Sequence, residues 1–313
     1  MGLTHNFRNF TTVTSVKRVA DVRHSVDSEW GEDVPCGCDH SAQSKWQVCG
    51  YEQRCEGGEW RRNDFCYRAD RVVLATGTCD QPNYLHVPGE HLSYVSYSIN
   101  DLDREIAQGG VTSASEPVVV VGAGLSAADA ILLALHHKIP VVHVFRRDAH
   151  DTGHVLHKLP EAIYPEYGHV LRLMRGEASE DGYRAFPGHT ISEFLRDNHL
   201  QLRPMKTTSN NNNNICDTVL KTSLALVLIG YRPDLSFLPK GSSLGFDADE
   251  PVDSKNNPLD VDPISYEHCE ECGLYAMGPL VGDNFVRFLQ GGALGIVADI
   301  WRKHKHGNSC TVK

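Results

Sequence analysis

Three small residues at a fixed spacing offer the clearest chemistry in this sequence. Gly122, Gly124 and Ala127 form the pattern G-x-G-x-x-A, which is typical of a turn that binds the pyrophosphate of a dinucleotide. The first glycine permits a tight turn, the second lets the backbone approach the phosphates, and the small third residue lets helix and strand pack closely. Ser126 lies in the same turn and joins the candidate cofactor-binding residues.

Two consecutive arginines indicate which dinucleotide is bound. Arg146 and Arg147 stand where an NAD site usually places a carboxylate for the ribose 2′-OH. Two guanidinium groups suit a 2′-phosphate, so NADPH is the expected cofactor. Asp148 follows directly, and a solvated basic strand end is the alternative interpretation.

These residues need a strand, a turn, a helix and a second strand to position them. Val118 to Val121 is an apolar run without alternation, as in a parallel strand covered on both faces. Leucines and alanines from 125 to 135 follow helical spacing, and Ile139 to Phe145 reads as the second strand. The phosphates would then lie at the helix N-terminus. A glycine turn in some other parallel sheet is the alternative.

Composition and charge narrow the class of protein. The chain has 313 residues, 41% of them hydrophobic, and a net charge of −10. This length allows a substantial core in one or two domains, and the negative charge disfavours nucleic-acid binding. The N-terminus lacks the apolar region of a signal peptide, and the longest apolar run, Leu224 to Ile229, is too short to span a bilayer. We therefore expect a soluble, cytoplasmic protein.

Ten cysteines are many for a reducing compartment. Without a secretory signal they are expected to be free thiols. Cys36, Cys38 and His40 form one cluster and Cys269 with Cys272 another. A single C-x-x-C lacks the second pair of a zinc site, and the two glutamates between these thiols would raise their pKa. We therefore expect no metal site.

The remaining segments read mostly as short strands. Thr190 and Glu193 form a capping box, which predicts a helix through Asp197. Five asparagines, Asn210 to Asn214, predict a low-complexity loop. The other expected elements are a strand at Thr11 to Val19, a hairpin from Trp46 to Tyr67 turning at Gly57–Gly58, a strand at Asp70 to Ala75, a helix at Asp101 to Gln108 capped by Asn100, and a strand, glycine-rich loop and helix from Leu274 to Trp301.

Several motifs together resemble a known family. RVVLATG, GAGLSAADA with FRR, and LVLIGYRPD occur in this order, and they resemble the flavin-dependent monooxygenases that bind FAD and NADPH. MGLTHNFRNF, IYPEYGHV and GPLVGDNFVRF resemble more closely the oxidative stress-induced growth inhibitor family, over nearly the whole chain. The resemblance implies an α/β fold with two interleaved, Rossmann-like dinucleotide-binding domains.

The resemblance also implies domain limits. Residues 1–111 would be the remainder of an FAD-type domain with a β-meander, 112–230 an NADP(H)-binding Rossmann domain, and 231–313 a return to the FAD-type domain. The chain would cross between the domains twice, at the strand that precedes Thr76 and Gly77 and at the strand that precedes Tyr231.

A second cofactor follows from the same resemblance. Gly282 and Asp283 match the family's second flavin contact, where a carboxylate holds the ribityl side of FAD. The family begins with an FAD-binding strand and its own glycine turn, but no G-x-G-x-x-G precedes Gly122. We therefore expect a truncated form that lacks this strand and turn, and that does not retain FAD in stoichiometric amounts.

The resemblance leaves two functions open. One is an NADPH-dependent flavoprotein monooxygenase-like protein linked to negative regulation of cell growth. The other is a catalytically inactive NADP(H)-binding regulatory or interaction protein. EHLSYVSYSIN lacks the F-x-G-x-x-x-H signature of the Baeyer–Villiger relatives, so no catalytic residue is named. The expected partners are the nucleotide and a small-molecule substrate or a protein.

Overall fold

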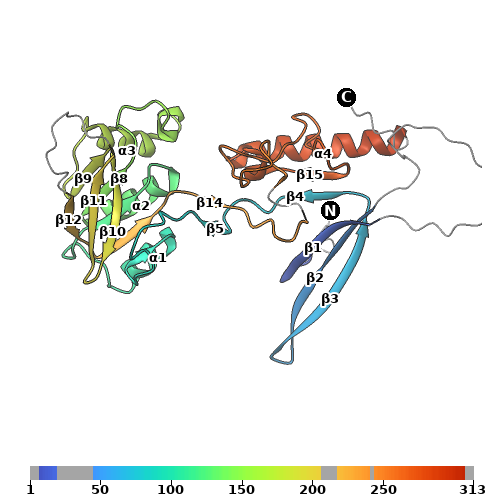
Figure 1. Ribbon diagram of the computed structural model, residues 1–313, viewed down its shortest axis with the longest axis horizontal. Helices are drawn as coiled ribbons and strands as arrows, with labels where there is room; N and C mark the ends of the chain where they lie inside the picture. Colours follow the sequence, from blue (N-terminus) through green and yellow to red (C-terminus); the bar gives the residue numbers. More distant parts are fainter. Residues whose placement is uncertain (1–6, 20–44, 206–216, 240–242, 307–313) are drawn as a thin grey trace, which may run out of the picture. The chain divides into compact units, whose positions relative to one another are not determined.

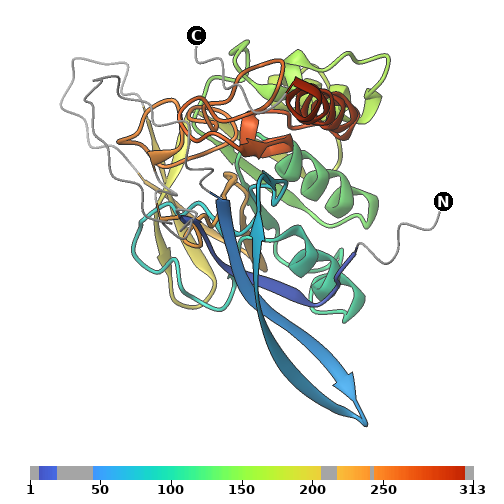
Figure 2. The same ribbon diagram turned by 90° about the vertical axis from the view of Figure 1, so that its right-hand side faces the viewer.

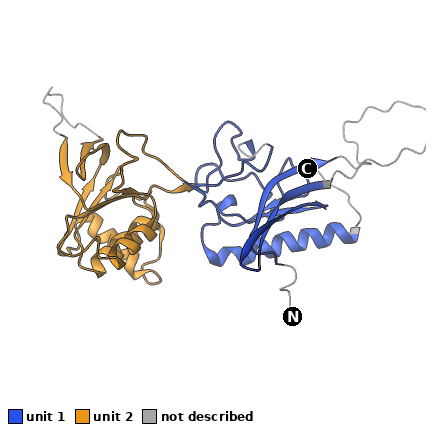
Figure 3. Cartoon of the chain, turned by 90° about the horizontal axis from the view of Figure 1, so that it is seen from below, with its two compact units in different colours: residues 1–81, 232–313 blue, residues 82–231 orange. Residues whose placement is uncertain are grey.

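The computed structural model (Figure 1) describes residues 7–19, 45–205, 217–239 and 243–306. The chain divides into two compact units (Figure 3). Unit 1 comprises residues 1–81 and 232–313, and unit 2 comprises residues 82–231. The chain passes between them at β5 (Gln81–Pro82) and β14 (Tyr231–Arg232), which pair with each other.

A five-stranded parallel sheet forms the centre of unit 2. Its order is β6-β13-β7-β8-β9, and each neighbouring pair is parallel. All residues of β7, β8 and β13 are buried, because a parallel sheet is covered on both faces. The strands are β6 (Val95–Ser96), β7 (Val118–Val121), β8 (Val141–Phe145), β9 (Tyr183–Pro187) and β13 (Leu224–Val227).

Two different layers cover this sheet (Figure 1). Val120 of β7 packs with Ile131 in the helical layer, whereas Val119 packs with Phe194 on the opposite face. The helical layer contains α1 (Ile99–Ala107), α2 (Leu125–His136) and α3 (Pro165–Arg175), with a 3-10 turn, η2 (Val155–Lys158). The other layer is an antiparallel sheet of β10 (His189–Leu195), β11 (His199–Pro204) and β12 (Thr218–Lys221).

The predicted strand–turn–helix–strand order is confirmed by β7, α2 and β8. The helix predicted from Thr190 to Asp197 is wrong, because this segment forms β10. Ile191 and Phe194 are buried in the core while β10 pairs with β11, and this long-range pairing outweighs a local capping pattern. The cap of α1 is Ser98, whose side chain accepts from the Asn100 N–H. The asparagine run lies outside the described residues.

Unit 1 combines a meander with a second, small parallel sheet. The antiparallel sheet is β1 (Thr11–Val19), β2 (Lys45–Glu56) and β3 (Glu59–Ala69), which confirms the predicted strand and hairpin. The β2–β3 hairpin is a long twisted ribbon (Figure 2, blue). Parallel strands β4 (Val72–Leu74) and β15 (Leu274–Ala276) pair, and a 3-10 turn, η4 (Gly278–Val281), and α4 (Val286–His306) follow β15. Trp46, Leu74 and Leu280 belong to the core of this unit.

The cysteines differ from expectation at one pair. Cys49 on β2 lies opposite Cys66 on β3, and a disulfide joins them. The prediction of free thiols is therefore wrong for this pair, because strand register brings together two residues that local sequence does not link. Cys55, Cys79 and Cys269 are free thiols, while the Cys36 cluster lies outside the described residues.

The surroundings of Cys269 disfavour the thiolate form of its side chain. Burial raises the pKa of the Cys269 thiol to about 11, and a hydrogen bond to Asp260 adds to the shift. A thiol with a raised pKa is a poor ligand, because metals bind the thiolate. In the part of the chain that the structure describes, no three His, Cys, Asp or Glu side chains gather in a way that could hold a metal ion.

Candidate nucleotide-binding site

Gly122 begins the turn after β7 in a conformation that requires glycine. Its φ is +128°, and a Cβ atom there would lie 2.3 Å from the carbonyl oxygen of Leu228. L-residues rarely adopt this backbone region. The Gly122 N–H donates to the carbonyl of Val144 on β8 at 2.9 Å. The turn therefore passes closely between β8 and the residue that follows β13.

Gly124 leaves the start of α2 open. It is the N-cap residue, with φ −91°, and no side chain among the described residues caps the helix there. A Cβ atom at Gly124 would meet nothing within 4 Å. Ser126 is exposed in the first turn, whereas Ala127 is fully buried and allows α2 to pack closely against the sheet. The first N–H groups of a helix lack intrahelical acceptors, so this end of α2 suits an anion.

The arginine pair lies beside this turn. Strands β7 and β8 are parallel neighbours, and Val121 pairs with Val144. The residues that follow the two strands, Gly122 and Arg146, therefore leave the sheet at the same edge. The structure thus brings together the glycine turn and the strand end that the sequence singled out.

The two arginines differ in their surroundings. The Arg147 guanidinium lies 3.8 Å from the Asp151 carboxylate, and it occupies the space next to Gly153. Arg146 is exposed and makes no hydrogen bond or ion pair with a described residue. The carboxylate of Asp148 accepts the backbone N–H of His150 at 2.9 Å. Arg146 is therefore the arginine that is available to a ligand.

Two buried histidines support these loops, and neither is among the site residues predicted from the sequence. His143 on β8 is 1% exposed, with Nε2 2.6 Å from the Gly122 carbonyl oxygen and Nδ1 2.8 Å from the Tyr183 hydroxyl. His154 is also buried, and its Nε2 lies 2.8 Å from the Asp148 carbonyl oxygen. A polar residue in the middle of the apolar VVHVF strand was the available signal for His143.

The remaining candidate residues lie in unit 1. Thr76 and Gly77 follow β4, and Gly77 has φ +75°. Gly282 ends η4 with φ +88°, and the Asp283 carboxylate accepts the Tyr266 hydroxyl at 3.2 Å. Burial raises the pKa of Tyr266, and the charge of Asp283 adds to the shift. This turn offers a carboxylate just before α4.

The sequence of this chain matches one known protein family over most of its length. Residues 38–257 match the family described as pyridine nucleotide-disulphide oxidoreductase. The chain belongs to the pyridine nucleotide-disulphide oxidoreductase family. Members of this oxidoreductase family are flavoproteins with a nucleotide cofactor, so family membership implies nucleotide binding here.

Two curated relatives confirm the family resemblance that the sequence motifs indicated. The chain is 42% identical over 309 residues to "Oxidative stress-induced growth inhibitor 1" of Homo sapiens, covering 96% of this chain and 60% of that protein. It is 37% identical over 319 residues to "Oxidative stress-induced growth inhibitor 2" of Homo sapiens, covering 97% and 60%. The chain thus spans about 60% of the length of these relatives.

Solved structures with a similar fold, together with the family match, confirm the predicted fold of two dinucleotide-binding units. A bacillithiol disulfide reductase from Bacillus cereus matches with a TM-score of 0.58 and 18% identity, over 94% of this chain and 71% of its own. Thioredoxin reductase from T. acidophilum matches with a TM-score of 0.57 and 16% identity, over 95% of this chain and 74% of its own.

Among the described residues, no helix is long and apolar enough to cross a membrane.

Proposed function

We propose that unit 2 binds NADPH, and that the chain is part of a flavoprotein monooxygenase-like oxidoreductase linked to negative regulation of cell growth. The observation that carries the proposal is the open N-terminus of α2 beside Arg146, which has no partner among the described residues. The domain limits expected from the resemblance belong to the same proposal. Unit 2 contains the whole proposed NADP(H)-binding domain, residues 112–230, together with β6 and α1.

The glycine turn suits the pyrophosphate. Backbone N–H groups at a helix N-terminus and the helix dipole both favour negative charge. The space beside Gly124 allows phosphate oxygens to approach the backbone. Gly122, Gly124, Ser126 and Ala127 therefore form the proposed pyrophosphate site.

Arg146 suits the 2′-phosphate. In a βαβ nucleotide site, the end of the second strand faces the adenosine ribose. Arg146 stands there without a partner among the described residues, and a guanidinium binds phosphate through charge-assisted hydrogen bonds. Arg147 is already paired with Asp151, so its contribution to binding should be smaller.

The two arginines predict how nucleotide preference responds to mutation. We expect NADPH to bind more tightly than NADH by about ten to a hundred-and-fifty-fold, which corresponds to roughly 1.5–3 kcal/mol. Arg146→Ala should remove most of this preference, and Arg147→Ala should remove less. NADH affinity should stay nearly unchanged, because NADH lacks the phosphate. Calorimetry with both nucleotides on the parent and the two variants measures this.

Salt is the internal control for this measurement. Raising the ionic strength should narrow the gap between NADPH and NADH, because an exposed ion pair is screened. Equal binding of both nucleotides by the parent would mean that Arg146 is only a solvated residue at the end of β8. Binding of neither nucleotide would overturn the proposed function.

Flavin is the second cofactor that the family implies, and this chain offers only part of a site for it. We propose that Gly282 and Asp283 contact the flavin in longer relatives, with Thr76 and Gly77 at the crossing between domains. The pyrophosphate of FAD needs N–H groups at a helix N-terminus, but no G-x-G-x-x-G precedes Gly122. The described residues therefore do not suffice to hold FAD.

This shortfall predicts the visible absorption spectrum of the purified chain. We expect no stoichiometric flavin absorbance, because Asp283 alone cannot replace the contacts to the pyrophosphate. The spectrum of the protein before and after denaturation measures bound flavin. A yellow preparation with one tightly held flavin per chain would contradict this prediction.

The alternative function shares the nucleotide site. A catalytically inactive NADP(H)-binding regulator would use the same turn and the same arginine. Oxidation of NADPH in the presence of added FAD would favour the oxidoreductase, because a regulator that only binds the nucleotide does not consume it.

A further inference from the structure

A histidine occupies the centre of a strand that is otherwise apolar. His143 lies in β8, all of whose residues are buried, and its side chain is 1% exposed. A buried polar side chain destabilises the fold unless its polar atoms are hydrogen-bonded. Both ring nitrogens of His143 have a partner. The strand therefore contains a buried polar side chain whose two nitrogen atoms are both hydrogen-bonded.

The partners determine which ring nitrogen carries the proton. The Gly122 carbonyl oxygen can only accept, so Nε2 carries the hydrogen and donates it. Nδ1 is then the acceptor for the Tyr183 hydroxyl. Burial lowers the pKa of His143 to about 4 and raises that of Tyr183, so the histidine is neutral and the tyrosine protonated at neutral pH. Tyr183 therefore donates a hydrogen bond to His143, and His143 donates one to the Gly122 carbonyl.

The two hydrogen bonds of His143 fix the orientation of one peptide group in the glycine turn. The C=O and N–H of a trans peptide point in opposite directions. When the Gly122 carbonyl points at His143, the Ala123 N–H points in the opposite direction, away from the imidazole ring. No described residue accepts that N–H. The Gly122 N–H is also bound to β8, through Val144, so neither polar group of Gly122 is free to rotate.

We propose that His143, oriented by Tyr183, is a positioning residue that holds the Gly122–Ala123 peptide with its N–H directed at the pyrophosphate. The inference rests on the proposed binding of NADPH by unit 2. It assigns a binding role to two residues that touch no nucleotide themselves. A role in core packing alone would leave nucleotide affinity unchanged as long as the unit stays folded.

The test measures NADPH affinity in variants at the same temperature, with circular dichroism to establish that each is folded. His143→Leu should weaken NADPH binding by roughly tenfold, because the carbonyl loses its donor and the peptide can rotate. His143→Gln retains a donor amide and should stay within about threefold of the parent. Tyr183→Phe removes only the hydroxyl and should weaken binding by about threefold.

Val142→Ala is the matched control. Val142 precedes His143 on β8 and packs in the core on the opposite face of the sheet. Its truncation lowers stability without touching Gly122, so its NADPH affinity should equal that of the parent.

The outcomes separate this inference from the proposed function. A parent that binds no NADPH overturns both. A parent that binds NADPH while His143→Leu and Tyr183→Phe bind it equally well overturns the inference alone. Equal weakening in His143→Leu and Val142→Ala would also overturn it, because general loosening of β8 would then explain the effect. If His143→Leu does not fold, the NADPH affinities of Tyr183→Phe and His143→Gln decide whether the hydrogen bonds of His143 affect binding.

Discussion

Gly122→Ala should lower the free energy of unfolding of unit 2 by roughly 2–5 kcal/mol and abolish NADPH binding. The added Cβ would lie 2.3 Å from the Leu228 carbonyl oxygen, so the turn or the strand end must move. The φ of +128° adds strain for an L-residue. Denaturant unfolding followed by circular dichroism measures the stability, and calorimetry measures the binding.

Gly124→Ala separates folding from binding at the same turn. The φ of Gly124 is −91°, and a Cβ there meets nothing within 4 Å. Unfolding free energy should therefore stay within about 0.5 kcal/mol of the parent. NADPH affinity should fall by roughly tenfold or more, because the methyl group would stand where the phosphates approach. If Gly124→Ala binds NADPH as the parent does, the phosphates do not approach at this position.

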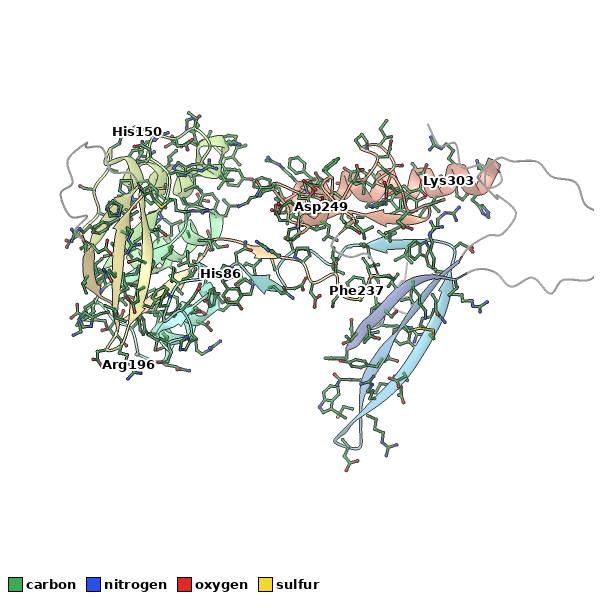
Figure 4. All side chains as sticks on the ribbon, viewed as in Figure 1. His86, His150, Arg196, Phe237, Asp249 and Lys303 are labelled. Carbon is green, nitrogen blue, oxygen red and sulfur yellow. A yellow bond between two sulfur atoms is a disulfide. The ribbon has the colours of Figure 1, made fainter. Side chains whose placement is uncertain are left out.

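Asp299→Ala should destabilise unit 1 by roughly 3–5 kcal/mol. The Asp299 side chain is 3% exposed on α4, and it accepts the Tyr275 hydroxyl at 2.8 Å and the Lys303 ammonium at 2.9 Å. Burial by itself would raise the pKa of Asp299, but the hydrogen bonds from Lys303 and Tyr275 outweigh it and lower the pKa. Removing the carboxylate leaves a buried hydroxyl without its acceptor and takes one of two carboxylates from Lys303, which also pairs with Glu267. Figure 4 labels Lys303 on α4.

Arg302→Ala is the matched control for this network. Arg302 also pairs with Asp299, but its side chain is 66% exposed, so its loss should cost less than about 1 kcal/mol. Residues 82–231, which form unit 2, contain no tryptophan, so denaturant unfolding followed by tryptophan fluorescence reports on unit 1. Equal stability of Asp299→Ala and the parent would show that the network does not hold α4 in place.

The sequence by itself determined the centre of unit 2. Residues 118–145 carry local signals that agree: a buried apolar run, small residues at a fixed spacing, a helical apolar stripe and a second strand. The structure has β7, α2 and β8 there, because each element depends on the pattern of its own residues. The β2–β3 hairpin was predictable for the same reason, since Gly57 and Gly58 turn the chain between two strand patterns. Motifs distributed along the chain identified the family.

Tertiary structure alone decided the features that depend on residues distant in sequence. Segment 189–195 became a strand because β11 pairs with it, and Cys49 met Cys66 through strand register. Arg146 and Arg147 are equivalent in the sequence, but only Arg147 has Asp151 beside it. His143 lies in an otherwise apolar strand, and only the fold places Gly122 on one side of its ring and Tyr183 on the other. The hydrogen-bond partner of a buried polar atom is set by packing, and local sequence does not specify it.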